Sequence, residues 1–396
     1  MENKPMNQGL RAAKAAKQDE FYTQYVDIQK EIEAYLEFDE DTFRNKVVYC
    51  NCDDPFESNF FKYFAANFNK LGLKKLITTS YDGSPIAGAQ LSFLEYNDDE
   101  GERQKPTAIS IEIEEVKDIN GDGSTGIEDV QLFLEKNPHT HTHLREGGDF
   151  RSQECIDLLE EADIVVTNPP FSLFKEFFAQ LVKFKKKFLI IANKNAITYL
   201  EIFPFIKGNS VWTGVTAFSG GMWFIADYMG KYEKTIDGVK LINVPTIWLT
   251  NLDHGRRHQN LPLMTMVDNL RYSKHKELKG KEGYSRYDNF DALEVPFTDA
   301  IPSDCDDIMG VPISFLDKYN PDQFEIVGNS DDGSMMRDLG VRPLGKEFIK
   351  AYRARGGTGH YSPGMRMLGL LEPQVRVIFK RLLIRHRSTG PEGDRR

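Results

Sequence analysis

The residues with the clearest chemical potential form one short segment that directly follows the apolar run 164–166. The segment consists of Asn168, Pro169, Pro170 and Phe171. The Asn side-chain oxygen and a Pro carbonyl can accept hydrogen bonds from the two N–H groups of an exocyclic amine, and the prolines add no competing backbone donors. Phe171 can stack on the planar base that carries such an amine. These four residues are therefore candidates for chemistry at the amine of a nucleobase.

Short apolar runs alternate with helical patterns around this segment. The runs 47–50, 75–80, 164–166 and 188–192 are typical of buried strands. The stretches 56–71 and 173–184 carry apolar residues at helical spacing, and Gly72 is expected to end the first of these helices. This order predicts an α/β fold with a doubly wound, mostly parallel sheet, in which ligands bind beyond the carboxyl ends of the strands.

Taken together, the motifs resemble those of the EcoRI-like adenine-specific DNA methyltransferases. The likeness extends from about Gln18 to Arg385 and is carried by the segments 19–23, 51–55, 148–151, 168–171, 193–198 and 251–254. The resemblance implies a Rossmann-like catalytic domain that uses S-adenosylmethionine (SAM). It also implies methylation of N6 of an adenine that is flipped out of double-stranded DNA.

The resemblance further assigns residues to the cofactor. The implied contacts are Phe21, Tyr22 and Thr23 at the methionine end, the turn Asn51, Cys52, Asp53 and Asp54, the pair Asp149 and Phe150 at the adenine, and Asn168. Asp82, which follows the second strand, is the candidate for the ribose hydroxyls. The turn at 51–55 has no glycine, although such cofactor loops are commonly rich in glycine because the backbone must approach the ligand.

The chain is long enough for a catalytic domain and a second domain. We expect a flexible segment at 1–17, a catalytic domain at 18–245 with an insertion at about 83–147, a target-recognition region at 246–385, and a disordered tail at 386–396. The net charge is −10, but residues 201–396 hold 27 Lys and Arg against 25 Asp and Glu. A modestly basic C-terminal half is compatible with DNA binding. Candidate base-reading residues are Arg256, Arg257 and Asn260, because Arg suits guanine and Asn suits adenine.

Composition favours a cytoplasmic enzyme. No apolar run has transmembrane length, and the N-terminal residues lack the apolar core of a signal peptide. Four cysteines without paired spacing suit a reducing compartment, and Cys50 and Cys52 are expected to be structural rather than metal or redox groups. We expect a monomer, and a cognate restriction endonuclease is a conceivable partner.

A second motif lies within the expected insertion and fits a twelve-residue calcium loop. The candidate ligands are Asp118, Asn120, Asp122, Ser124 and Asp129. The alternative is a turn rich in Asp and Gly that caps the following helix without metal. If Ca²⁺ binds, it is expected to be structural. The alternating His139, His141 and His143 could bind a transition metal, but an exposed loop is the simpler interpretation.

Other functions remain open at this stage. Asn-Pro-Pro-aromatic segments also serve methylation of RNA bases and of a protein glutamine amide. A non-enzymatic, calcium-dependent binding module is a further alternative, although the intact segment 168–171 argues against it. Trp223 could flank a target base, and a place in the core is an equally good interpretation.

Overall fold

The computed structural model describes residues 22–52, 58–81, 108–119, 121, 125–126, 128–130, 132, 141–216, 218, 220–225, 232–236, 238–359 and 364–387. These residues form two compact units. The first includes the described residues up to Lys194 and the range Thr213–His254, and the second includes Asn195–Trp212 and the described residues from Gly255 onward. The expected domain boundary lies at 245/246. The units instead divide after His254, and residues 195–212 belong to the second unit.

The first unit contains two sheets and the helices that cover the larger one. Its strands are β1 (Tyr22–Thr23), β2 (Val47–Cys50), β3 (Lys75–Thr79), β4 (Ile109–Ile113), β5 (His141–His143), β6 (Ile164–Thr167), β7 (Lys187–Asn193), β9 (Met222–Ile225), β10 (Lys234–Ile236), β11 (Val239–Val244) and β12 (Thr246–Thr250), with β8 (Trp212–Thr213) at the boundary of the units. Its helices are α2 (Tyr25–Phe38), α3 (Asn59–Ala66), α4 (Phe68–Leu71), α7 (Gln153–Glu161), η2 (Phe171–Leu173) and α8 (Phe174–Lys183), and η3 (Lys194–Thr198) begins at its end.

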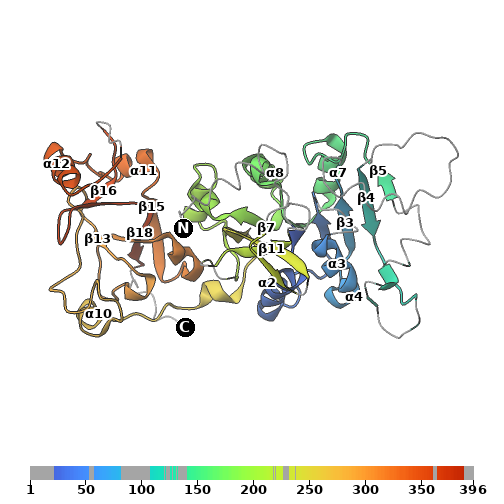
Figure 1. The fold of residues 1–396 in the computed structure, drawn as a ribbon. Helices are drawn as coiled ribbons and strands as arrows, with labels where there is room; N and C mark the ends of the chain where they lie inside the picture. The colour runs from blue at the N-terminus through green and yellow to red at the C-terminus, as the bar shows by residue number, and fades with distance from the viewer. Residues whose placement is uncertain are drawn as a thin grey trace, which may run out of the picture. The chain divides into compact units, whose positions relative to one another are not determined.

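The larger sheet has the order β5-β4-β3-β2-β6-β7-β12-β8. Its central strands β3, β2, β6 and β7 are parallel neighbours, whereas β4, β5 and β12 pair antiparallel. In Figure 1, α7 and α8 lie on one side of this sheet and α2, α3 and α4 on the other. The expected parallel, doubly wound arrangement therefore holds for the centre. The complete sheet is mixed because β12 pairs antiparallel, as do β4 and β5, which come from the region expected to be an insertion.

The smaller sheet of this unit has the order β1-β9-β11-β10, and all its pairs are antiparallel. Its short edge strand β1 contains Tyr22 and Thr23, two of the three residues predicted at the methionine end of the cofactor. Gln24, which follows β1, donates a 2.7 Å hydrogen bond from Nε2 to the Trp223 carbonyl of β9. This pairing fixes the segment that precedes α2.

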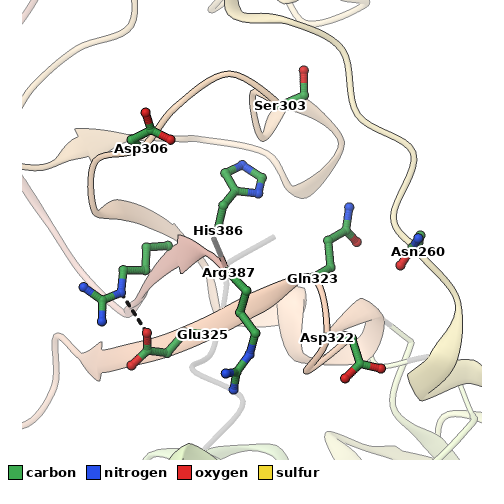
Figure 2. Close-up of a pocket in the computed structure, with 9 residues that line it drawn as sticks. Asn260, Ser303, Asp306, Asp322, Gln323, Glu325, His386 and Arg387 are labelled. Carbon is green, nitrogen blue, oxygen red and sulfur yellow. Dashed lines mark hydrogen bonds and ion pairs between the residues drawn. The ribbon is translucent and has the colours of Figure 1, made fainter. Parts of the chain in front are cut away.

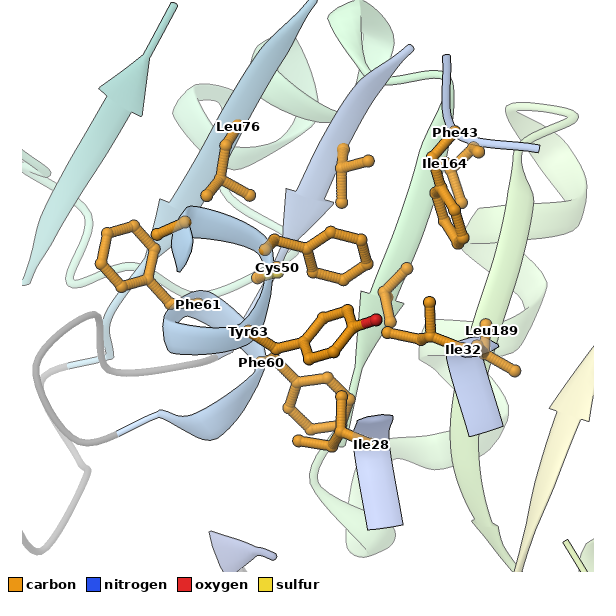
Figure 3. Packing of buried hydrophobic residues seen from close by; sticks show 14 of the residues in the cluster. Ile28, Ile32, Phe43, Cys50, Phe60, Phe61, Tyr63, Leu76, Ile164 and Leu189 are labelled. Atoms are coloured by element: carbon orange, nitrogen blue, oxygen red, sulfur yellow. The ribbon is translucent and has the colours of Figure 1, made fainter. Parts of the chain in front are cut away.

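Aromatic and aliphatic side chains from α2, α3 and the central strands form the core of the first unit. Figure 3 shows Phe60, Phe61 and Tyr63 of α3 packed among side chains of the sheet and of α2. Strand β2 is buried at every position, which is the pattern of a central parallel strand covered on both faces. Burial of each large apolar side chain stabilises the fold by roughly 1.5–3 kcal/mol.

The helical pattern at 56–71 forms two helices rather than the single one expected. Ser58 caps α3 by accepting hydrogen bonds from the Phe60 and Phe61 amides. Asn67 separates α3 from α4, and its side chain donates to the Tyr63 carbonyl at 2.8 Å. Competition of a short amide side chain for backbone groups explains the break. Gly72 then ends α4 in the left-handed conformation, as expected.

The second unit is built around a four-stranded sheet of order β13-β14-β18-β15 and a two-stranded sheet. Its strands are β13 (Leu293–Glu294), β14 (Met309–Pro312), β15 (Phe324–Asn329), β16 (Leu368–Leu370), β17 (Arg376–Ile378) and β18 (Arg381–His386). Its helices are α9 (Phe203–Lys207), η4 (Gly255–His258), α10 (Met266–Tyr272), η5 (Thr298–Ala300), η6 (Ile313–Lys318), α11 (Gly333–Asp338) and α12 (Lys346–Ala354). No helix in the described part of the chain combines the length and apolarity that crossing a membrane requires.

A buried carboxylate in α2 fixes the loop that follows β8. Glu31 is fully buried, and its Oε1 accepts from the Val215 amide at 2.7 Å and the Tyr35 hydroxyl at 3.1 Å. Its Oε2 accepts from the Thr216 amide at 2.7 Å and from the Thr216 hydroxyl. A Cβ atom on Gly214 would lie only 2.1 Å from Glu31 Oε1, so the close approach requires glycine. Burial raises the pKa of Glu31, and its hydrogen bonds offset part of this rise.

We predict that Glu31→Gln destabilises the protein by about 1–3 kcal/mol, because the amide NH₂ would face backbone donors. The raised pKa also sets a pH trend. The contribution of Glu31 to stability is fully present below its unfolded pKa of about 4.3 and decreases as pH rises through the folded pKa. Urea unfolding at increasing pH above about 4.3 should therefore show the difference between wild type and variant shrinking.

The matched control is Glu37→Gln, which makes the same change at an exposed position of α2. It should alter the free energy of unfolding by less than about 0.5 kcal/mol. A stability difference at Glu31 that grows with pH would contradict the raised pKa.

Candidate active site

The candidate cofactor and catalytic residues follow neighbouring parallel strands. Asn51 follows β2, Ser80 follows β3, and Asn168 follows β6. Because these strands are adjacent and parallel, their carboxyl ends lie at one edge of the sheet. This edge is where ligands bind in open α/β sheets.

The turn after β2 is fixed by the ends of the strands on both sides. Thr167 of β6 donates from Oγ1 to the Asn51 carbonyl, and Thr79 of β3 donates to Asn51 Oδ1 at 3.3 Å. Asn51 is buried, and the next residue, Cys52, has a φ of +58°. The expected cofactor turn therefore reaches a left-handed backbone conformation without glycine, which its sequence does not reveal. Asp53 and Asp54 lie outside the described residues.

Gly148 sets the position of the Asp149–Phe150 pair. Its φ is +70°, and a Cβ atom there would lie 1.9 Å from the Ser80 carbonyl oxygen and 2.9 Å from Ala108 Cβ. Only glycine allows this approach. The pair is thereby placed beside the carboxyl end of β3.

Asp149 is held as a carboxylate by Arg151. Arg151 donates from Nε to Asp149 Oδ1 at 2.9 Å and from Nη2 to Oδ2 at 2.7 Å. These hydrogen bonds and the positive charge lower the pKa of Asp149. The remaining guanidinium nitrogen of Arg151, Nη1, donates a hydrogen bond to Glu176 of α8 at 2.9 Å. Asp149 can therefore act only as a hydrogen-bond acceptor near neutral pH.

Phe150 lies in the protein interior, with 2% of its surface exposed. Its ring and the ring of Phe177 in α8 are in an edge-to-face arrangement, with centroids 5.2 Å apart. Its backbone carbonyl accepts a hydrogen bond from Gln180 Nε2 at 2.9 Å. The loop is therefore anchored to the helix that follows the Asn-Pro-Pro-Phe segment. The assignment of Phe150 to the cofactor adenine stays a prediction.

The Asn-Pro-Pro-Phe segment leaves β6 and enters η2. Asn168 is half-buried and Pro169 is buried. The Pro170 carbonyl accepts from the Leu173 amide at 3.1 Å, which closes the turn. Phe171 is partly buried and packs against the core of the first unit. The catalytic turn is thus supported by the same core as the sheet.

Thr23 presents a buried polar atom near the start of α2. Its carbonyl accepts from Asn59 Nδ2 at 2.7 Å, but among the described residues its buried Oγ1 has no hydrogen-bond partner. An unsatisfied buried hydroxyl is a natural contact for a polar ligand. Tyr22 of β1 pairs with Ile225 of β9. Phe21 and Asp82 lie outside the described residues.

The calcium-like loop is described only in part. Asp129 is buried, and its two oxygens accept from the Ile119 and Gly126 amides at 2.7 and 2.9 Å. Asp118 accepts from the Gly121 amide at 2.6 Å. These bonds are those of a turn that uses carboxylates to hold backbone donors.

Asn120, Asp122 and Ser124 of this loop, and His139, lie outside the described residues. Within the part of the chain that is described, no three His, Cys, Asp or Glu residues gather as a metal site. The structure therefore does not support calcium as a cofactor.

The three candidate base-reading residues lie in the second unit and contact other protein groups. Arg256 forms a 2.8 Å ion pair with Asp317, and the Arg257 guanidinium lies 3.4 Å from the ring centroid of Trp212. Asn260 accepts from Asn320 Nδ2 at 2.9 Å. Their role in DNA recognition stays a prediction.

Asn260 also lines a polar cavity of about 1030 Å³, which Figure 2 shows. The arginine side chains that line this cavity already bind other groups of the protein. Arg385 pairs with Glu325 at 2.7 Å, and Arg387 donates to the Pro321 carbonyl at 2.5 Å. This cavity therefore offers few charges for a polyanion.

The polar groups at this edge of the sheet are of the kinds that a polar cofactor contacts. The Thr23 hydroxyl is a buried polar atom that lacks a partner among the described groups, Asn51 and Asp149 supply acceptors, and Asn168 lies at the next strand end. A mixed α/β sheet with parallel central strands is consistent with the fold of a methyltransferase.

Comparison with known proteins identifies the family. The family model described as "Adenine-specific methyltransferase EcoRI" matches residues 9–386. The chain belongs to this family and is an adenine-specific methyltransferase.

Individual relatives agree with this assignment. The chain is 44% identical to Type II methyltransferase M.EcoRI of Escherichia coli, over 81% of this chain and 89% of the relative. It is 33% identical to Type II methyltransferase M.MgeORF184P of Mycoplasma genitalium, over 80% and 84%. It is 32% identical to Type II methyltransferase M.MpnI of Mycoplasma pneumoniae, over 80% and 83%. No solved structure matches the chain.

We predict that Gly148→Ala lowers both stability and SAM affinity. The left-handed backbone alone costs roughly 1–2 kcal/mol for a residue with a Cβ, and displacement of the Ser80 carbonyl adds to this cost. Thermal unfolding and calorimetric titration with SAM measure the two effects. Gly283→Ala is the control, because a Cβ there meets nothing within 4 Å. Wild-type stability and SAM affinity in Gly148→Ala would show that the close approach is not required.

Proposed function

We propose that the protein transfers a methyl group from SAM to N6 of an adenine flipped out of duplex DNA. The observation that carries this proposal is the position of Asn168–Phe171 at the carboxyl end of β6, next to the Asn51 turn, in a chain of the EcoRI adenine-specific methyltransferase family. M.EcoRI and the two Mycoplasma relatives are named Type II methyltransferases, which favours DNA over RNA or a protein amide.

In this proposal Asn168 and Pro169 orient the amine. The Asn168 side-chain oxygen and the Pro169 carbonyl accept from the two N6–H groups, which draws the nitrogen toward tetrahedral geometry and localises its lone pair. The adenine nitrogen is conjugated with its ring and is a poor nucleophile, so orientation lowers the barrier by several kcal/mol. No base is needed before attack, because the proton can leave afterwards.

Phe171 holds the flipped base. Adenine N6 is inaccessible within a base pair, so the nucleotide has to leave the stack, and an aromatic ring then replaces its lost stacking partners. Phe171 has its place fixed by packing against the core, while part of its surface remains accessible. A rigid support of this kind keeps the amine in line with Asn168.

The cofactor would be held by residues of the same edge. Thr23 would bind the methionine end, the Asn51–Cys52 turn would lie against the ribose and sulfonium region, and Asp149 would accept from the adenine amino group. When bound, SAM supplies an activated methyl group. The low pKa of Asp149 keeps this residue an acceptor over the physiological pH range.

The second unit is the proposed target-recognition region, and Arg256, Arg257 and Asn260 remain its candidate base contacts. Because M.EcoRI is a Type II methyltransferase, we further infer that a restriction endonuclease of the same specificity is the natural partner. The expectation of a monomer stands as part of the proposal.

We predict that Asn168→Ala reduces methyl transfer by about 100- to 1,000-fold, because one preorganised hydrogen bond at the reacting group is lost. SAM affinity should fall by a smaller factor, because Asn168 is only one of several predicted cofactor contacts. The measurement is transfer of labelled methyl from SAM to unmethylated DNA, followed by digestion to nucleosides to detect N6-methyladenine.

Asn168→Asp is the conservative control, since a carboxylate keeps acceptor oxygens at this position. It should retain more activity than the alanine variant, because the acceptor is kept. Equal activity of wild type and Asn168→Ala would remove Asn168 from the site. Wild-type protein that binds SAM but labels no DNA would move the substrate to RNA or protein.

A further inference from the structure

One helix of the second unit carries a dense group of cations on its exposed surface. The segment 337–366 holds seven Lys and Arg against two Asp and Glu, a charge of +5 in a chain of net charge −10. Within it, α12 places Lys346, Lys350 and Arg353 at spacings of four and three residues, which puts them on one face of the helix. All three side chains are exposed.

The opposite face anchors α12 to the second unit. Phe348 is buried, and a Cβ atom on Gly369 of β16 would lie 2.7 Å from its ring and 2.5 Å from Leu344 Cδ2. At the end of the helix, a Cβ atom on Gly357 would lie 2.4 Å from the Tyr352 ring. Ring-to-backbone packing at both ends leaves the helix little freedom to turn its charged face inward. Figure 1 shows α12 and β16 in the same part of the second unit.

The cations of this face also differ from other basic residues of the second unit. Among the described residues, Lys346, Lys350 and Arg353 form no ion pair or side-chain hydrogen bond. By contrast, Arg381 pairs with Glu294 and Arg385 pairs with Glu325, each at 2.7 Å. A paired arginine must give up its partner to bind a phosphate, whereas the α12 cations lose only water.

The dimensions of the face suit a duplex. Seven residues of α-helix separate Lys346 from Arg353, about 10 Å along the helix axis. Duplex DNA carries one phosphate per about 1.7 Å of its axis, so the same length presents about six phosphates. Three unpaired cations on a rigid helix therefore meet an excess of negative charge.

We propose that the Lys346–Lys350–Arg353 face of α12 is a docking surface for the phosphate backbone of duplex DNA. This inference rests on the proposed function, because it takes duplex DNA as the substrate. The surface positions the duplex and reads no bases, since phosphate contacts carry no sequence information directly.

The test is the triple variant Lys346→Gln, Lys350→Gln, Arg353→Gln in the full chain. We expect its affinity for DNA to fall by about 10- to 500-fold at 0.1 M salt, equally for target and unrelated duplexes. The slope of the logarithm of the binding constant against the logarithm of salt concentration should decrease by about 2.7. The KM for DNA should rise while kcat at saturating DNA stays near wild type.

The control triple variant Lys46→Gln, Lys70→Gln, Lys74→Gln makes the same change in net charge at exposed positions near the amino ends of β2 and β3. It should keep the wild-type affinity and salt slope. Equal losses of DNA affinity in both variants would mean that the effect comes from net charge alone, and this would overturn the proposal. An unchanged salt slope in the α12 variant would also overturn it. Normal thermal unfolding of both variants excludes misfolding. Wild-type protein that methylates no DNA would instead refute the proposed function.

Discussion

The hydrogen bonds that meet at Asn51 are the interaction on which the candidate site depends. Thr79 and Thr167 reach this residue from the strands on either side of β2, so a single turn joins the carboxyl ends of three parallel strands. These bonds are buried, where each donor or acceptor left unmatched is costly. The candidate cofactor turn and the candidate catalytic segment after β6 therefore share one support at the ends of adjacent strands.

Sequence patterns predicted the parts of the fold that depend on local periodicity. The central strands and α8 form at the expected positions, because apolar runs and helical spacing determine which face is buried. The antiparallel pairing of β4 and β12, and the break at Asn67, depend on tertiary contacts and could not be read from periodicity. For the site, the order of motifs predicted which strand ends meet, but the left-handed Cys52 and the buried Phe150 follow from close packing that no motif encodes.

The sequence also does not show which basic side chains are paired in the folded protein. Arg256 and Arg257 stand out in the sequence, yet the Arg256 guanidinium group is held by Asp317. Arg381 and Arg385 are held in the same way by Glu294 and Glu325. The cations of α12 are spread over seven residues and look unremarkable in the sequence. Only the helix brings them to one face, and only the packing of Phe348 and Tyr352 shows that this face is turned to solvent.

The Asn-Pro-Pro-Phe segment and the buried Glu31 network depend on one hydrophobic core. Phe171 and Val215 both pack against this core, and the Val215 amide is a donor to Glu31. Protein interiors are close-packed and transmit displacement from one side to another. A change in the charge of Glu31 therefore acts first on the loop at 214–216, in which Val215 packs against the same core as Phe171. Stability and the position of the candidate site residue Phe171 therefore depend on one hydrophobic core.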